Sequence, residues 1–238
     1  MYIYNKEEHT YTLLGDNMLK VILKVIVIFF FLICLITLDK VDARIKELPL
    51  FGKVIFVDPG HGGRDPGTMY GKIKEKDIVL DISMILRDEL SKQGAIVYMT
   101  RDSDEDLSSK WDKKKKRGDL YRRILMYKKY NADMYLSIHI NQYKNPSWGG
   151  IEVLYNSINP ENKKIGTILM KNFKNEFGTK RKLKTTDLYM YKNTTTPGVL
   201  IECGFLSNKN ERYLLRQKSY QIKLSKSITN SVIEYFNS

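Results

Sequence analysis

Four residues of this chain, His61, Glu75, His139 and Glu202, are of the types that bind metal ions or carry protons. Imidazole is the commonest side-chain metal ligand, and carboxylates serve both as ligands and as proton carriers. His61 lies in a turn, residues 58–68, where four glycines allow tight backbone conformations and two prolines fix φ. Two imidazoles and a carboxylate form a zinc-type catalytic set that leaves one coordination position open for water.

Strand alternation indicates which of these side chains share a face. In residues 135–141 it places Ser137, His139 and Asn141 on one face and three apolar residues on the other. His61 follows an apolar strand, and Glu202 lies near the end of another. Open α/β sheets bind ligands at the carboxyl ends of their strands, so we expect these residues to meet at one rim.

Each residue alone also has a purely structural interpretation. His61 could hydrogen-bond its own turn, and His139 could be a satisfied core histidine. Glu75 could favour the N-terminus of its helix through the helix dipole. Glu202 is different, because a carboxylate within an apolar run is costly to bury unless it is paired or functional. Together the structural interpretations require four coincidences, which favours a metal site.

Alternating strands and helices must position these residues. Residues 54–57, 95–100, 134–140, 151–155, 188–191 and 199–203 are predicted strands. Helices are predicted over residues 75–92, 119–130 and 161–177, with one or two more over 208–236; residues 101–118 are predicted as a polar loop. Gly94 stands where a helix C′ residue belongs. The pattern predicts an α/β fold: a single domain with a mostly parallel twisted sheet flanked by helices.

Near the N-terminus an apolar stretch, residues 25–38, follows Lys20 and Lys24. A positive segment before a short apolar run is typical of a secretory signal peptide or a signal anchor. Residues 41–43 loosely match a cleavage site, and Ile33 before the cysteine argues against a lipoprotein signal.

These features predict export across the cytoplasmic membrane, with the product either secreted or anchored. The predicted domain plan is a cytoplasmic segment over residues 1–18, a signal peptide or signal anchor over 19–43 and a catalytic domain over 44–238. Residues 19–38 are the candidate segment for membrane association.

The chain has 238 residues and a formal net charge of +13. Nucleic acid, an anionic membrane surface and an anionic polymer such as a cell wall are candidate partners for such a charge. The sequence contains none of the common base-reading signatures, so we expect no nucleic-acid partner. Its two cysteines have neither a disulfide-framework nor a zinc-site spacing, which leaves histidine and carboxylates as candidate ligands.

Residues 53–236 resemble the zinc-dependent N-acetylmuramoyl-L-alanine amidases of the type 3 amidase family. The resemblance is carried by Asp-Pro-Gly-His-Gly-Gly at 58–63, Glu75, Ser-Ile-His-Ile-Asn at 137–141 and Glu-Cys-Gly-Phe-Leu-Ser-Asn at 202–208. Within the family, residues 75–78 and 197–205 look closest to the CwlD type, the germination-specific amidases of bacterial endospores.

The resemblance implies that His61, Glu75 and His139 hold Zn²⁺ and that Glu202 is the catalytic carboxylate. It implies hydrolysis of the amide between the lactyl group of N-acetylmuramic acid and L-alanine of the stem peptide. In CwlD-type members this prepares muramic acid for conversion to the muramic-δ-lactam of spore cortex, which places the enzyme in the intermembrane space of a developing spore. Arg123 fits an arginine position of the family and is a candidate supporting residue. Ser137 and Asn141, on the face of His139, either orient the ligands or the substrate or make ordinary strand-end hydrogen bonds.

Peptidoglycan is the partner that the resemblance implies, and a separate recruiting or activating protein stays open. The alternatives are a zinc peptidase that cuts within stem peptides and a non-catalytic wall-binding module. The basic run of residues 110–117 is either a solvated loop or a surface that attracts carboxylates of stem peptides or anionic lipid. Relatives often carry Ala-Asn where Tyr127 and Lys128 stand here, which bears on a local supporting contact.

Overall fold

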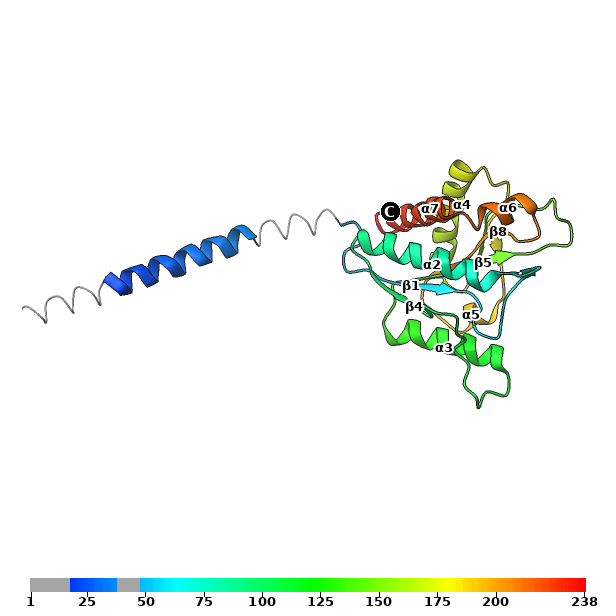
Figure 1. The fold of residues 1–238 in the computed structure, drawn as a ribbon, viewed down its shortest axis with the longest axis horizontal. Helices are drawn as coiled ribbons and strands as arrows, with labels where there is room; N and C mark the ends of the chain where they lie inside the picture. The colour runs from blue at the N-terminus through cyan, green and yellow to red at the C-terminus, as the bar shows by residue number, and fades with distance from the viewer. Residues whose placement is uncertain (1–17, 38–47) are drawn as a thin grey trace, which may run out of the picture. The chain divides into compact units, whose positions relative to one another are not determined.

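The computed structural model describes residues 18–37 and 48–238 as two separate parts (Figure 1). The first part is a helix, Met18–Thr37, of 20 residues with a mean hydropathy of 3.0, which is long and apolar enough to cross a membrane. Its length and composition agree with the predicted signal peptide or anchor. Residues 1–17 and the predicted cleavage site at residues 41–43 lie outside the described residues.

A six-stranded sheet forms the centre of the second part. Its strands, in spatial order, are β4 (Ile96–Met99), β1 (Val54–Pro59), β5 (Met134–Asn141), β8 (Gly198–Phe205), β6 (Glu152–Tyr155) and β7 (Lys184–Thr185). The first four are parallel, whereas β6 runs antiparallel to β8 and β7 runs parallel to β6. The predicted α/β fold with a mostly parallel sheet is therefore confirmed.

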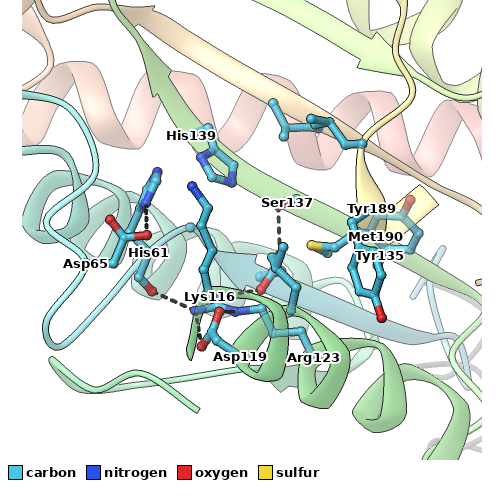
Figure 2. Close-up of a pocket in the computed structure, with 15 residues that line it drawn as sticks. His61, Asp65, Lys116, Asp119, Arg123, Tyr135, Ser137, His139, Tyr189 and Met190 are labelled. Atoms are coloured by element: carbon cyan, nitrogen blue, oxygen red, sulfur yellow. Dashed lines mark hydrogen bonds and ion pairs between the residues drawn. The ribbon is translucent and has the colours of Figure 1, made fainter. Parts of the chain in front are cut away.

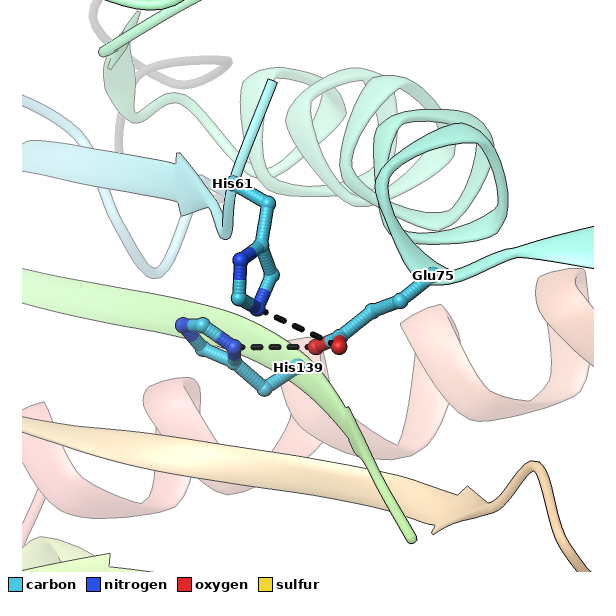
Figure 3. A group of neighbouring side chains, drawn as sticks. All are labelled: His61, Glu75 and His139. Atoms are coloured by element: carbon cyan, nitrogen blue, oxygen red, sulfur yellow. Dashed lines mark hydrogen bonds and ion pairs between the residues drawn. The ribbon is translucent and has the colours of Figure 1, made fainter. Parts of the chain in front are cut away.

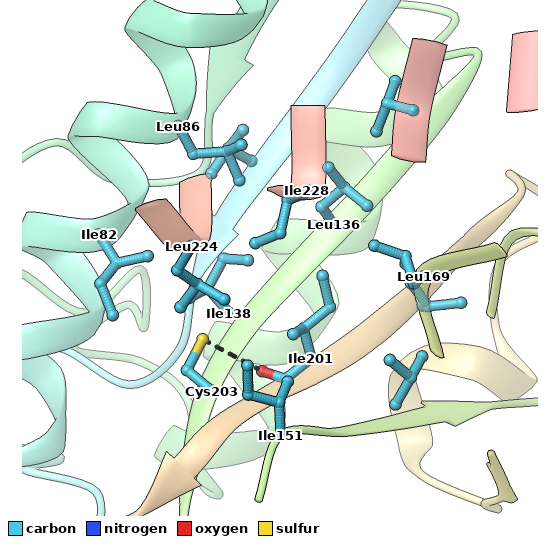
Figure 4. Close-up of a cluster of buried hydrophobic side chains, with 14 of the residues drawn as sticks. Ile82, Leu86, Leu136, Ile138, Ile151, Leu169, Ile201, Cys203, Leu224 and Ile228 are labelled. Atoms are coloured by element: carbon cyan, nitrogen blue, oxygen red, sulfur yellow. Dashed lines mark hydrogen bonds between the residues drawn. The ribbon is translucent and has the colours of Figure 1, made fainter. Parts of the chain in front are cut away.

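Helices cover both faces of this sheet (Figure 1). The helices are α2 (Glu75–Lys92), α3 (Lys115–Lys129), α4 (Pro160–Phe177), α5 (Tyr189–Lys192), α6 (Lys209–Leu214) and α7 (Lys218–Phe236). Apolar side chains of α2, α4 and α7 pack with those of one sheet face into the larger core (Figure 4). A smaller cluster joins the other face to α3 and α5.

Strand alternation divides side chains between these two clusters as expected. Leu136 and Ile138 point into the larger core, together with Cys203 of β8. Tyr135 and Leu200 belong to the opposite face. That second face, where it reaches the carboxyl ends of β1, β5 and β8, is the place where the candidate residues lie.

Local capping signals explain where the main helices begin and end. Asn159 accepts a hydrogen bond from the Glu161 backbone N–H at the start of α4, and Gly178 ends this helix in the left-handed conformation. Gly94 follows α2 with φ of 92°, as its predicted C′ position requires.

Two sequence-based predictions were wrong. Residues 188–191 were predicted as a strand, but α5 is a short helix whose Met190 is buried in the smaller cluster. A short apolar run does not by itself distinguish a strand from a helix, and here packing against α3 decides. The predicted loop 101–118 is also too long, because α3 begins at Lys115. No apolar residue precedes Leu120 in this helix, so hydrophobic periodicity does not reveal its first turn.

Two further elements were not predicted. The two-residue strand β7 extends the sheet edge beyond β6, and the hairpin β2 (Met69–Tyr70) and β3 (Ile73–Lys74) precedes α2. Both are too short to give a periodic signal. The C-terminal region, predicted as one or two helices, contains two, α6 and α7.

Candidate active site

His61, Glu75 and His139 converge at the carboxyl end of the sheet (Figure 3). Glu75 Oε2 lies 3.2 Å from His61 Nε2, and Glu75 Oε1 lies 3.0 Å from His139 Nδ1. One ligand atom from each residue lies within 4.8 Å of the others. The three come from the turn after β1, the first residue of α2 and the strand β5, so only the fold brings them together.

This donor set fits a zinc ion. Two imidazole nitrogens and a carboxylate oxygen are ligand types that zinc prefers at catalytic sites. Two glycines make room for them, because a Cβ on Gly60 would lie 2.3 Å from His139 Cε1 and a Cβ on Gly67 would lie 2.5 Å from Glu75 Oε2. The backbone of the turn therefore approaches the three side chains more closely than any other residue type would allow.

The three side chains are electrostatically coupled. Burial by itself would raise the pKa of Glu75, but hydrogen bonds and charge attraction from His139 and His61 hold it well below its usual range. Burial would lower the pKa of His61, whereas Glu75 and Asp65 together raise it. Asp65 Oδ2 lies 2.9 Å from His61 Nδ1. A carboxylate at Nδ1 leaves Nε2 facing Glu75, which is the orientation that a metal ligand needs.

Glu202 stands beside this group on β8. In the sheet register it is paired with His139 on one side and with Glu152 on the other. Its Oε2 is shielded from solvent and has no hydrogen-bond partner among the described residues. Burial raises the pKa of Glu202 to about 7, with His139 opposing and Glu75 and Glu152 adding to the rise. A carboxyl group with such a pKa can both accept and donate a proton near neutral pH.

Two buried arginines hold the turn that carries His61. Arg123, only 1% exposed, donates to the carbonyls of Pro59 at 2.7 Å and His61 at 2.6 Å and to Asp58 Oδ1 at 2.6 Å. Arg101 donates to the carbonyls of Pro59 at 3.1 Å and Gly60 at 2.9 Å. His61 itself has φ of 61°, a conformation that costs a non-glycine residue free energy. The two guanidinium groups help to hold it there.

Two of the three predicted supporting residues are buried next to Asp58, and the third lies at the end of β5. Arg123 and Ser137 are buried and meet at Asp58, whose Oδ2 accepts a hydrogen bond of 2.7 Å from Ser137 Oγ. Both side chains support the turn through Asp58, and both also line a cavity beside the site. Asn141 ends β5, where its Oδ1 accepts a hydrogen bond from the Gln142 backbone N–H at 2.8 Å.

Sequence reasoning missed Asp58, Asp65 and Arg101. Asp58 and Asp65 lie within the glycine-rich turn, where an aspartate is common for local reasons. Arg101 looked like the first residue of a polar loop, and no local pattern indicates that its side chain turns back to bind carbonyls of the turn after β1.

A cavity of about 280 Å³ adjoins the site on the α3 side (Figure 2). Gly60, His61 and His139 line it next to the candidate metal ligands, and Lys116 reaches it from α3. Its apolar lining comes from α3, α5, the residue that precedes α5, and two strands: Leu120, Tyr135, Leu188, Met190 and Leu200. The site therefore combines a metal-type ligand set, a buried carboxyl group and a neighbouring cavity that can accept part of a substrate.

Comparison with known proteins agrees with this arrangement. The family model described as N-acetylmuramoyl-L-alanine amidase (Amidase_3) matches residues 55–234. The chain is 40% identical over 195 residues to the germination-specific N-acetylmuramoyl-L-alanine amidase of Bacillus subtilis (strain 168), a match that covers 80% of this chain and 82% of that relative.

Solved structures of related enzymes have the same fold. The CwlD amidase from Clostridioides difficile, solved in complex with the GerS lipoprotein, is similar with a TM-score of 0.75 and 32% identity over 78% of this chain and 99% of that one. An N-acetylmuramoyl-L-alanine amidase from Clostridium difficile 630 is similar with a TM-score of 0.70 and 29% identity over 78% and 97% of the two chains.

The family match covers the whole sheet-and-helix part except its ends, including all four candidate residues. The relatives from Bacillus subtilis and Clostridium difficile 630 are both named as N-acetylmuramoyl-L-alanine amidases. On the fold, the site and these comparisons together, the chain belongs to the Amidase_3 family of N-acetylmuramoyl-L-alanine amidases.

Proposed function

We propose that this amidase is zinc-dependent, with His61, Glu75 and His139 as the metal ligands and Glu202 as the catalytic acid and base. The observation that supports this proposal most directly is the pairing of Glu202 with His139 in the neighbouring strands β8 and β5. A carboxyl group that can accept a proton therefore lies beside the candidate metal ligands. The bond to be cleaved joins the lactyl group of N-acetylmuramic acid to L-alanine of the stem peptide.

Zinc, when bound, would polarise the scissile carbonyl and lower the pKa of its water towards about 7. Glu202 accepts the proton of the attacking water as the new C–O bond forms. It then donates that proton to the alanine nitrogen as the C–N bond breaks, which releases a free lactyl carboxylate and a free amino group. Asp65 holds the proton on His61 Nδ1, and Arg123 and Arg101 hold the turn in place.

Mass analysis of digested peptidoglycan tests this proposal. We expect intact glycan strands and whole stem peptides that begin with a free L-alanine, together with loss of activity on chelation and recovery with Zn²⁺. Fragments cut inside the stem peptide would indicate the peptidase alternative. Binding to peptidoglycan without release of amino groups would indicate a wall-binding module.

We also propose a role in forming the muramic-δ-lactam of spore cortex. Support comes from the 40% identity to a relative named as germination-specific. Cortex from cells that lack this gene should contain no muramic-δ-lactam in a muropeptide analysis, and the gene should restore it. Cortex with normal lactam content in such cells would contradict the proposal.

The proposed location is outside the cytoplasmic membrane, reached through the predicted segment of residues 19–43, with residues 44–238 as the catalytic domain. The apolar helix Met18–Thr37 supports export or anchoring. Cell fractionation distinguishes a membrane-bound full chain from a secreted product. A separate protein partner is proposed because the similar CwlD amidase from Clostridioides difficile was solved in complex with the GerS lipoprotein. Activity of the purified chain with and without co-expressed lipoproteins tests this.

A further inference from the structure

One cation of the basic run, Lys116, lines the active-site cavity. Its side chain extends from α3 into the space that also contains His61 and His139 (Figure 2). Lys116 also lines a second cavity, which shares His61, Asp65 and Asp119 with the first. It therefore lines both cavities that adjoin His61.

The neighbouring carboxylates already have other partners. Asp65 Oδ2 pairs with His61, and its Oδ1 accepts a hydrogen bond from the Gly67 backbone N–H at 3.1 Å. Asp119 binds Arg123 Nε at 2.8 Å and the Leu107 backbone N–H at 2.8 Å. Lys116 makes no hydrogen bond or ion pair of its own with the side chains that the structure describes. Its charge acts on Asp65 through space without a direct contact, so its ammonium group can still bind a ligand.

Other cations of the run are engaged or face elsewhere. Lys115 Nζ donates to the carbonyls of Ser109 at 2.9 Å and Lys110 at 2.8 Å. Arg117 lies over the Tyr189 ring at 5.1 Å. Lys113 and Lys114 are exposed and line neither cavity. Lys116 therefore differs from these other cations in its position at the active-site cavity, not in its charge.

The chemistry of the cavity suggests what it binds. An ammonium group at the edge of an apolar wall fits a ligand that carries a carboxylate next to aliphatic atoms. A peptide that continues from the alanine side of the scissile amide carries aliphatic atoms and, at least at its C-terminus, a carboxylate. We propose that Lys116 is a specificity-determining residue that binds a carboxylate of the stem peptide, while Leu188 and Leu200 contact the peptide's aliphatic atoms. This inference rests on the proposed function.

Two synthetic muramoyl peptides test it with the full, zinc-loaded chain. In one the residue after L-alanine carries a free carboxylate, and in the other the same carboxylate is an amide. Wild type should prefer the carboxylate by about 10-fold in kcat/KM, the scale of one hydrogen bond to a charged group. Lys116→Met should raise KM for the carboxylate substrate by about 10-fold, leave kcat within about 2-fold and remove the preference.

Lys116→Arg should restore most of the preference, because it restores the charge. Lys113→Met, from the same run, should behave like wild type. Equal thermal midpoints and zinc contents of all variants show that folding and metal binding are intact.

Three results would overturn the role of Lys116: a wild type that is active but does not discriminate, a Lys116→Met variant that still prefers the carboxylate, or an equal loss on both substrates. Absence of hydrolysis of either substrate by the wild type, or hydrolysis that chelation does not affect, would instead contradict the proposed function itself.

Discussion

Glu202 illustrates how one residue's chemistry depends on its neighbours. In water its carboxyl group would be ionised at neutral pH, but here it is half-buried between His139 and Glu152 in adjacent strands. Glu152 is itself paired with Lys184 Nζ at 2.6 Å. The Oε2 atom of Glu202 is shielded from solvent and has no hydrogen-bond partner among the described residues, which suits the proton transfer proposed for this side chain.

We expect Glu202→Gln to lower kcat by at least about 100-fold, the usual scale of general acid–base catalysis. The amide has nearly the same shape but cannot take up a proton, so zinc content should stay at the wild-type level. Release of amino groups from peptidoglycan and elemental analysis measure the two quantities. Glu176→Gln, on the exposed side of α4, is the matched control. Turnover within about 3-fold of wild type would remove Glu202 from the mechanism.

Asp65 pairs with Nδ1 of His61, and we expect it to orient this candidate metal ligand. Asp65→Asn should weaken zinc affinity by about 10–100-fold, because the neutral amide no longer stabilises the His61 orientation that presents Nε2. His61→Ala removes a candidate zinc ligand and should lower zinc affinity further than Asp65→Asn does. Competition with a fluorescent chelator gives both affinities. Equal affinities for Asp65→Asn and wild type would show that the ion pair has no part in metal binding.

At the scale of elements, the turn between β1 and α2 is the part on which the site depends most. It holds His61 in a left-handed conformation, brings Gly60 against His139 and Gly67 against Glu75, and is fixed from outside by Arg101 and Arg123.

Gly67 and Gly71 have similar backbone conformations but different surroundings. Alanine variants at the two positions therefore distinguish the effect of backbone strain from that of a steric clash. Gly67 has φ of 67° and a Cβ there would collide with Glu75 Oε2, whereas Gly71 has φ of 59° and open space around it. Gly71→Ala should cost about 1 kcal/mol of stability from backbone strain and leave zinc binding unchanged. Gly67→Ala should incur a similar strain and, in addition, displace Glu75 and lower zinc affinity by at least about 10-fold.

Denaturant unfolding and metal titration of the two variants give the comparison. If both alanine variants bind zinc as tightly as wild type, a Cβ at position 67 does not displace Glu75. Backbone strain would then be the only effect of alanine at either position.

At the scale of the whole molecule, one buried aspartate connects four segments of the chain. Asp58 at the end of β1 binds Arg123 of α3, Thr100 after β4 and Ser137 of β5. Burial by itself would raise the pKa of Asp58, but Arg123 and the hydrogen bonds from Thr100 and Ser137 lower it overall. Such a network stabilises the fold and the His61 turn together.

This pKa shift makes stability depend on pH in a definite direction. A carboxyl group whose pKa is lower in the folded protein contributes stability above its unfolded pKa of about 3.9, and this contribution is lost as the pH falls through the folded pKa. Wild type should therefore lose stability below about pH 4. Asp58→Asn should cost about 3–5 kcal/mol at pH 7, because it leaves Arg123 buried without its partner.

Urea unfolding at pH 7 and pH 3 measures both effects. The variant should show a smaller difference between the two pH values than wild type, because it lacks the titrating group. An equal difference in both proteins would mean that Asp58 does not contribute to acid unfolding.

Much of this molecule could be predicted from the sequence. Apolar periodicity indicated the long helices α2 and α4 and the buried strands β1, β5 and β8, and strand alternation placed His139 on the opposite face from Leu136 and Ile138. These signals are local, because one face of a strand or helix must be apolar to be buried. The α/β fold class follows from them, and so does the expectation that the candidate residues meet at one rim.

Contacts between distant residues decided the rest. The start of α3, the helical form of α5 and the short strand β7 depend on packing against other elements, so no local pattern indicates them. The hydrogen bonds from Arg101 and Arg123 to the turn after β1 join residues about forty to sixty positions apart. The orientation of Lys116 toward the cavity likewise depends on where α3 lies on the sheet. A side chain's partners are set by three-dimensional proximity, which sequence spacing fixes only within a single element.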